Sequence, residues 1–159
     1  MLFPEEDPSS TYIMISRGSG IAHFRGFIRR LFVEKTRVGY AFRGRVWLIS
    51  HAQNSDSLLY HNEMKSIQKE FPDQFQYESI FPQSVAKNED ALLKHVENYS
   101  QKIYKKLTNG AHIYFSGDFK VDDINTMKDL FKSIAGQNNE IFDEWFKDIE
   151  HNQQWHTPF

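Results

Sequence analysis

Four short apolar runs alternate along the chain with longer stretches in which apolar residues recur every three or four positions. The runs are Tyr12–Ile15, Val46–Ile49, Phe75–Phe81 and Ala111–Phe115. Runs of this length are typical of buried strands, and the stretches between them have the period of amphipathic helices. Strands that alternate with helices pair in parallel, because each helix carries the chain back along the sheet. The sequence therefore predicts an α/β fold with a doubly wound parallel sheet, in which residues 154–159 add a fifth strand.

The same pattern places the helices and the loops between them. Apolar spacing predicts a helix over 21–32, another over 60–71 and a single long helix over 92–107. Residues 36–44 are expected to form a loop. Asn54 has the side chain of a helix N-cap and is expected to begin the helix that follows it.

The composition excludes several classes of function. The 159 residues carry a net charge of −2, which gives no overall attraction to nucleic acid or to an anionic membrane. The chain has no cysteine, which removes thiolate metal sites and thiol catalysis, and its seven histidines show no paired metal-ligand spacing, so no metal is expected. No run of about 18 apolar residues is present, so we expect a peripheral membrane association at most. Without an evident linker, residues 1–159 are predicted to form one domain.

Five short motifs occur in the order and spacing of one known domain. They are Gly18–Phe27, Asn54–Tyr60, Phe71–Phe75, Asn109–Phe115 and Gln154–His156. Together they resemble the NADP-binding domain of plant-type ferredoxin–NADP reductases over the whole chain. The resemblance implies a Rossmann-like fold, and a flavin-binding domain that would precede this sequence. Without flavin there is no hydride acceptor, and this chain supplies no substitute.

The resemblance assigns the loop after the first strand to the pyrophosphate of a dinucleotide. Gly18, Ser19 and Gly20 keep the pattern that lets backbone N–H groups and a helix N-terminus hold phosphate. They are therefore expected to be residual cofactor-binding residues. Two neighbours depart from the family, which has a threonine where Arg17 stands and a proline where His23 stands. We expect His23 to project toward the nicotinamide position.

Other family positions have lost the side chains that the reaction needs. The stretch that holds the 2′-phosphate in the family corresponds here to Pro82, Gln83, Glu89 and Ala91, which offer no cation. Ser116 stands where the family has a cysteine beside the reacting nicotinamide carbon. Phe159 ends the chain where the family ends in a tyrosine that follows an acid, and the acid is missing. We therefore expect no catalytic residue, with Ser116 and Phe159 only marking positions that have changed.

Three functions fit these observations. The first is a non-catalytic reductase-like domain that is a structural or accessory subunit of a larger complex, with protein partners and no cofactor. The second is the NADP(H)-binding half of a working reductase whose flavin domain lies on another chain or outside this sequence. The third is a nucleotide sensor that binds NAD(P)H weakly without chemistry. Because the family works in energy-transducing organelles, we expect a plastid or a mitochondrion, with the protein soluble or peripheral to a membrane.

Overall fold

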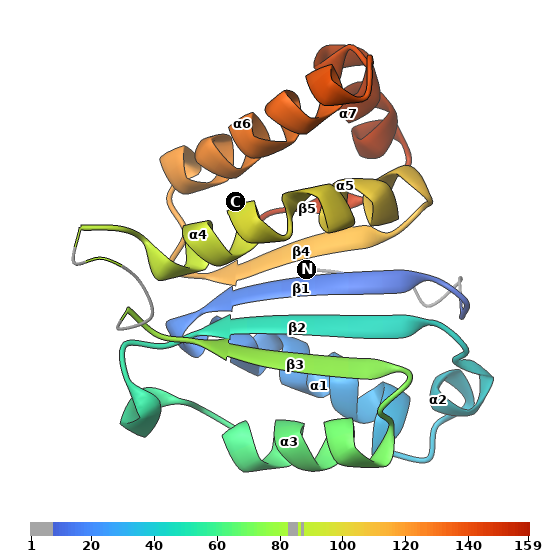
Figure 1. Ribbon diagram of the computed structural model, residues 1–159. Helices are drawn as coiled ribbons and strands as arrows, with labels where there is room; N and C mark the ends of the chain where they lie inside the picture. The colour runs from blue at the N-terminus through green and yellow to red at the C-terminus, as the bar shows by residue number, and fades with distance from the viewer. Residues whose placement is uncertain (1–7, 83–85, 87) are drawn as a thin grey trace.

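A parallel β-sheet forms the centre of the molecule in the computed structural model, which describes residues 8–82, 86 and 88–159 (Figure 1). In the described part of the chain the sheet has five strands in the order β3-β2-β1-β4-β5. Every neighbouring pair of strands is parallel. The strands are β1 (Thr11–Arg17), β2 (Arg45–His51), β3 (Phe75–Ile80), β4 (His112–Gly117) and β5 (Trp155–His156). This topology confirms the predicted doubly wound fold.

Helices cover both faces of the sheet, as the ribbon in Figure 1 shows. On one face lie α1 (Ile21–Phe32), α2 (Arg37–Ala41) and α3 (His61–Glu70). On the other lie α4 (Ala91–Asn98), α5 (Ser100–Thr108), α6 (Val121–Gln137) and α7 (Phe142–His151). Two single-turn 3-10 helices, η1 (Gly18–Gly20) and η2 (Ser55–Ser57), follow β1 and β2. No helix of the described residues is long and apolar enough to cross a membrane.

Alternating side chains of the central strands divide the core between the two faces. In β1, Tyr12 and Met14 pack with α1 and α3, whereas Ile13 and Ile15 pack with the helices from α4 to α7. The same alternation continues through β2 and β4. Burial on both faces explains why these strands read as continuous apolar runs in the sequence.

One predicted helix is divided in two. The expected long helix over 92–107 is interrupted at Tyr99, whose backbone leaves helical geometry with φ −107° and ψ 11°. Ser100 Oγ donates to the Glu97 carbonyl oxygen at 2.8 Å at this point. A serine that binds a nearby backbone carbonyl competes with regular helix hydrogen bonding. The prediction of one continuous helix was therefore wrong, although its apolar face was placed correctly.

Two further local predictions need correction. The expected loop over 36–44 contains the short helix α2, because the Thr36 side chain accepts a hydrogen bond from the Gly39 N–H at 3.0 Å and caps it. Asn54 does cap a helical turn, but that turn is η2. Helix α3 begins later, after Tyr60, which adopts a left-handed φ of 58°.

Candidate functional site

The strand order reverses between β1 and β4, so the loops that follow these two strands meet at the carboxyl edge of the sheet. Gly18 begins η1 with a φ of +63°, a conformation that glycine adopts without strain. Gly20 packs so closely on β4 that a Cβ atom at this position would lie 2.1 Å from the Ser116 carbonyl oxygen. The structure therefore brings two parts of the predicted site, the glycine loop and Ser116, against each other.

The start of α1 offers backbone donors to this edge. No side chain caps the helix at Gly20, and Ser19 is exposed in the preceding turn. The first N–H groups of a helix have no partner within the helix, and they attract phosphate groups. The main-chain geometry expected for a pyrophosphate is therefore present, without any cationic side chain in the first turn of α1.

Ser116 and His23 form a hydrogen bond across the loops. It joins Ser116 Oγ and His23 Nδ1 at 2.9 Å. Ser116 is only 2% exposed, whereas His23 lies at the surface on the first turn of α1. His23 was expected to project toward the nicotinamide position. In the structure it bonds directly to Ser116, which stands where the family has a cysteine. The Ser116 hydroxyl is therefore engaged by a histidine from the surface of α1.

A row of serines crosses the carboxyl edge of the sheet. In the strand register Ser16 lies opposite both Ser50 and Ser116, and Ser50 lies opposite Ser79. Ser16 Oγ donates to Ser50 Oγ at 3.1 Å. The sequence interpretation missed this row. The sequence feature that could have revealed the row is a serine at or near the end of each of the first four predicted strands.

Arg17, the other departure in the glycine loop, is paired within the protein. Its Nη2 atom lies 2.9 Å from Asp90 Oδ2, and its guanidinium lies 5.3 Å from the centre of the Phe119 ring. Burial alone would raise the pKa of Asp90. The Leu93 N–H and the Arg17 guanidinium bond the carboxylate and hold that pKa below its ordinary value. Burial and the nearby Arg17 charge lower the pKa of His51, which favours its neutral form.

The stretch expected to replace the 2′-phosphate site is only partly described. Gln83 lies outside the described residues, Pro82 is half-buried and Glu89 is exposed. Ala91 is 4% exposed in the first turn of α4, which Asp90 caps by accepting bonds from the Leu92 and Leu93 N–H groups at 3.0 and 3.1 Å. Where the family holds the 2′-phosphate, this chain thus has the helix cap Asp90 and the buried methyl group of Ala91.

A cluster of charged residues flanks the second motif on the α1–α3 side. Glu63 Oε2 lies 2.8 Å from Arg25 Nε, and Glu63 Oε1 lies 2.6 Å from Arg29 Nη1. The Arg25 guanidinium also lies 4.5 Å from the centre of the Tyr60 ring. Burial alone would raise the pKa of Glu63, but the two arginines outweigh burial and lower it. This cluster fastens α1 to α3.

The C-terminal residues lie at the β5 edge of the sheet. The His156 ring stacks on Tyr114 with 4.1 Å between ring centres, and burial followed by the nearby His112 lowers the pKa of His156. Phe159 is 62% exposed, and no ring among the described residues stacks on it. β5 runs parallel to β4, so the chain leaves β5 at the same carboxyl edge of the sheet at which Ser116 lies. Within the same described part, no three His, Asp or Glu side chains gather as metal ligands.

The chain is similar to a family of oxidoreductase domains. The family described as "Oxidoreductase NAD-binding domain" matches residues 14–124. A root isozyme of chloroplastic ferredoxin–NADP reductase from Oryza sativa subsp. japonica is 40% identical, over 99% of this chain and 42% of the relative. Root isozyme 1 from Arabidopsis thaliana is 36% identical with the same coverage. The chain thus spans less than half the length of these curated relatives.

Solved structures show the same fold. A ferredoxin–NADP+ reductase mutant from Plasmodium falciparum superposes with a TM-score of 0.68 at 19% identity, over 93% of this chain and 51% of that one. The reductase from the same organism with 2′P-AMP gives a TM-score of 0.67 at 18% identity, over 92% and 50% of the two chains. These matches confirm the resemblance read from the five motifs. The chain belongs to the oxidoreductase NAD-binding domain family and corresponds to the NADP-binding domain of ferredoxin–NADP reductases.

Proposed function

We propose that this chain is a non-catalytic form of the NADP-binding domain that serves as a structural or accessory subunit of a larger protein assembly. The observation that carries the proposal is the hydrogen bond between Ser116 and His23 at the switch point. Both residues replace a family residue, a cysteine at Ser116 and a proline at His23. Their polar groups would face a nicotinamide ring in a competent site, but here they bind each other.

A nicotinamide would have to break this contact in order to bind. Separating the pair would leave the buried Ser116 hydroxyl without its partner, which costs about 1–3 kcal/mol. That cost corresponds to a loss of roughly 5- to 150-fold in affinity. The one cation of the glycine loop, Arg17, is bound to Asp90 and would have to leave that ion pair to reach a phosphate.

The fold itself does not depend on the lost residues. Most of the buried residues in the described part of the chain are apolar, and a fold can persist while its site changes. A domain of this kind can be retained for its surface, as a subunit that contacts protein partners. The two root isozymes are chloroplastic, which supports a plastid over a mitochondrion. The proposal extends to an energy-transducing complex in that organelle.

One observation favours a second function, weak dinucleotide binding without chemistry. Gly18 keeps its left-handed conformation, Gly20 keeps its close approach to β4, and the first turn of α1 has no side-chain cap. These features would still bind a pyrophosphate through the backbone. A sensor that does not distinguish NADPH from NADH would fit this geometry.

The loss of catalysis can be tested in a fusion with a competent flavin domain. The flavin domain of the rice root isozyme is joined ahead of this chain, and NADPH-dependent reduction of ferricyanide is measured. FAD content and circular dichroism verify that both parts fold. We expect no turnover above that of free FAD. Turnover typical of a reductase, at about 1 per second or faster, would show that the site is competent and would contradict the proposal.

A matched variant shows whether the two replaced residues are responsible. His23→Pro and Ser116→Cys together restore the residues that the resemblance implies, and we expect this fusion to bind NADPH more tightly than the unmodified one.

The accessory role is tested separately by the native mass of the chain in extracts of its source. A chain of 18.8 kDa that migrates alone, without a stoichiometric partner, would contradict that role.

A further inference from the structure

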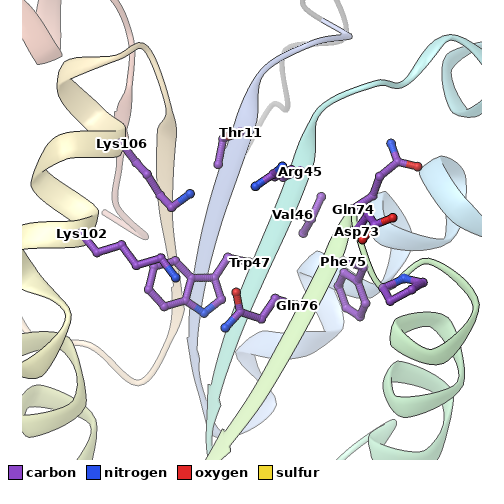
Figure 2. Close-up of a pocket in the computed structure, with 11 residues that line it drawn as sticks. Thr11, Arg45, Val46, Trp47, Asp73, Gln74, Phe75, Gln76, Lys102 and Lys106 are labelled. Carbon is purple, nitrogen blue, oxygen red and sulfur yellow. The ribbon is translucent and has the colours of Figure 1, made fainter.

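A basic cleft lies at the amino end of the sheet, on the edge opposite the switch point. Its volume is about 260 Å³, and it opens between α5 and the first residues of β1, β2 and β3 (Figure 2). Its lining includes Thr11, Arg45, Trp47, Gln76, Lys102 and Lys106. We call this the amino-end cleft. Ligands of doubly wound sheets bind at the other edge, so neither the fold nor the family position accounts for it.

Three cations converge on the amino-end cleft. Arg45 begins β2, and Lys102 and Lys106 lie one turn apart on α5, from which both side chains reach toward the strands in Figure 2. In the described part of the chain none of the three forms an ion pair. Asp73 also lines the cleft, yet it takes no part in those ion pairs either. Three positive charges therefore share a concave surface without a bound counter-charge.

The three cations repel one another. Burial lowers the pKa of Lys106, and the charges of Lys102 and Arg45 lower it further. Lys102 Nζ lies 4.8 Å from the centre of the Trp47 ring, which holds it over the floor of the cleft. An anion placed among the three groups would remove the repulsion and gain charge-assisted hydrogen bonds.

The size of the cleft limits what it can hold. Pockets for drug-sized ligands and cofactors occupy about 300–1,000 Å³, so a cleft of about 260 Å³ is too small for a dinucleotide. A compact dianion fits both the volume and the charge. The Thr11 hydroxyl can donate to it beside the cations, whereas the Gln76 amide already donates to Glu78 at 2.7 Å.

We propose that the amino-end cleft is a binding site for a phosphate group, either free phosphate or that of a small phosphomonoester, held by Arg45, Lys102 and Lys106. The site is independent of the proposed loss of catalysis at the switch point. Phosphate would bridge the start of β2 to α5 and tie a helix to the amino end of the sheet.

The test uses the full chain, with inorganic phosphate and glycerol 3-phosphate as two separate probes. The indole N–H signal of Trp47 is followed by NMR, with glycerol and sodium chloride at equal ionic strength as blanks. We expect a saturable shift with at least one probe, and the tighter of the two identifies the source of the phosphate. A variant that carries Glu5→Gln, Glu6→Gln and Asp7→Asn is titrated in parallel, to remove the three negative charges that precede β1 in the sequence.

Variants matched in charge decide whether the cleft is responsible. Lys102→Gln with Lys106→Gln should weaken binding at least tenfold, because each lost charge-assisted bond removes about that factor. Lys105→Gln with Lys132→Gln removes the same charge from exposed positions outside the cleft and should change binding less than threefold. Equal losses in both pairs would overturn the proposal. So would the lack of a saturable shift in both the natural chain and the variant without the three N-terminal acids.

Discussion

At the scale of single residues, the switch point is fixed by backbone contacts that exclude a side chain. Gly20 lies against the carbonyl of Ser116, and Gly117, with a φ of +109°, lies against Arg17. At Gly117 a Cβ atom would come within 2.0 Å of the Arg17 carbonyl oxygen. These contacts place the loops after β1 and β4 directly against each other.

Replacing Gly20 by alanine should destabilise the protein strongly. The added Cβ would meet backbone atoms that cannot rotate away, and overpacking of this kind costs about 1–3 kcal/mol or more. Gly26→Ala is the matched control, because that position faces open space within α1 and alanine favours a helix by about 0.5–1 kcal/mol. Urea unfolding should show opposite changes in the free energy of unfolding. A Gly20→Ala protein as stable as the natural chain would show that the two loops are not in close contact.

The candidate site was predictable residue by residue only where a local pattern carried the information. Gly18, Ser19 and Gly20 follow one predicted strand and Ser116 follows another, so the switch-point rule placed them together. The bond between Ser116 and His23 depends on side-chain rotamers and on the exact approach of α1 to β4, which spacing does not encode. Arg45 and Lys102 come from distant parts of the chain at the edge where the rule expects no ligand, so the amino-end cleft had no signal.

At the scale of elements, periodicity predicted the strands and the apolar helix faces well, and local hydrogen bonds decided the rest. The first four predicted strands agree with the observed ones to within two residues at each end. The fifth strand was expected over 154–159, but β5 is only Trp155–His156, and Pro158 has no N–H to donate to a strand ladder. The break at Tyr99 escaped prediction because the apolar spacing continues through it. Helix α2 escaped because its cap is a single threonine and none of its residues is buried.

The link between α1 and α3 should weaken in acid. The pKa of Glu63 is lowered from its ordinary 4.5 by Arg25 and Arg29 against the effect of burial. Its stabilisation is therefore present above pH 4.5 and is lost as the pH falls through the lower folded-state value. Glu63→Gln should reduce the free energy of unfolding by about 0.5–1 kcal/mol at pH 7, since the pair is partly exposed.

The difference in the free energy of unfolding between the natural chain and the Glu63→Gln variant should depend on pH. The natural chain and the Glu63→Gln variant should converge in stability as the pH falls below the lowered pKa of Glu63, where the carboxylate is protonated. Glu70→Gln is the control, because this exposed acid at the end of α3 forms none of the described ion pairs. If the difference in stability between the natural chain and the Glu63→Gln variant stayed constant with pH, charge would not be what joins the two helices.

At the scale of the whole molecule, nucleotide binding separates the proposed functions. We expect millimolar NADPH to raise the melting temperature very little, and by no more than NADH does, because Ser116, His23 and Arg17 are paired within the protein. A competent domain at one hundred times the dissociation constant would gain about 2.7 kcal/mol, a shift of several degrees. Differential scanning fluorimetry measures this directly. A clear shift with NADPH alone at micromolar concentration would instead support the working-reductase function.

The strand order also determines when the sheet can be completed during synthesis. β1 pairs with β2, and β2 pairs with β3, so three of the five described strands are available once the chain reaches Ile80. The other edge of β1 stays unpaired until β4 is made, when Tyr12 pairs with His112. Until β4 and its helices emerge, Ile13, Trp47 and their neighbours have no cover on the α4–α7 face. Uncovered apolar faces and unpaired strand edges are what chaperones bind on growing chains. During this interval β1, the central strand of the finished sheet, is an exposed edge strand that other chains can pair with.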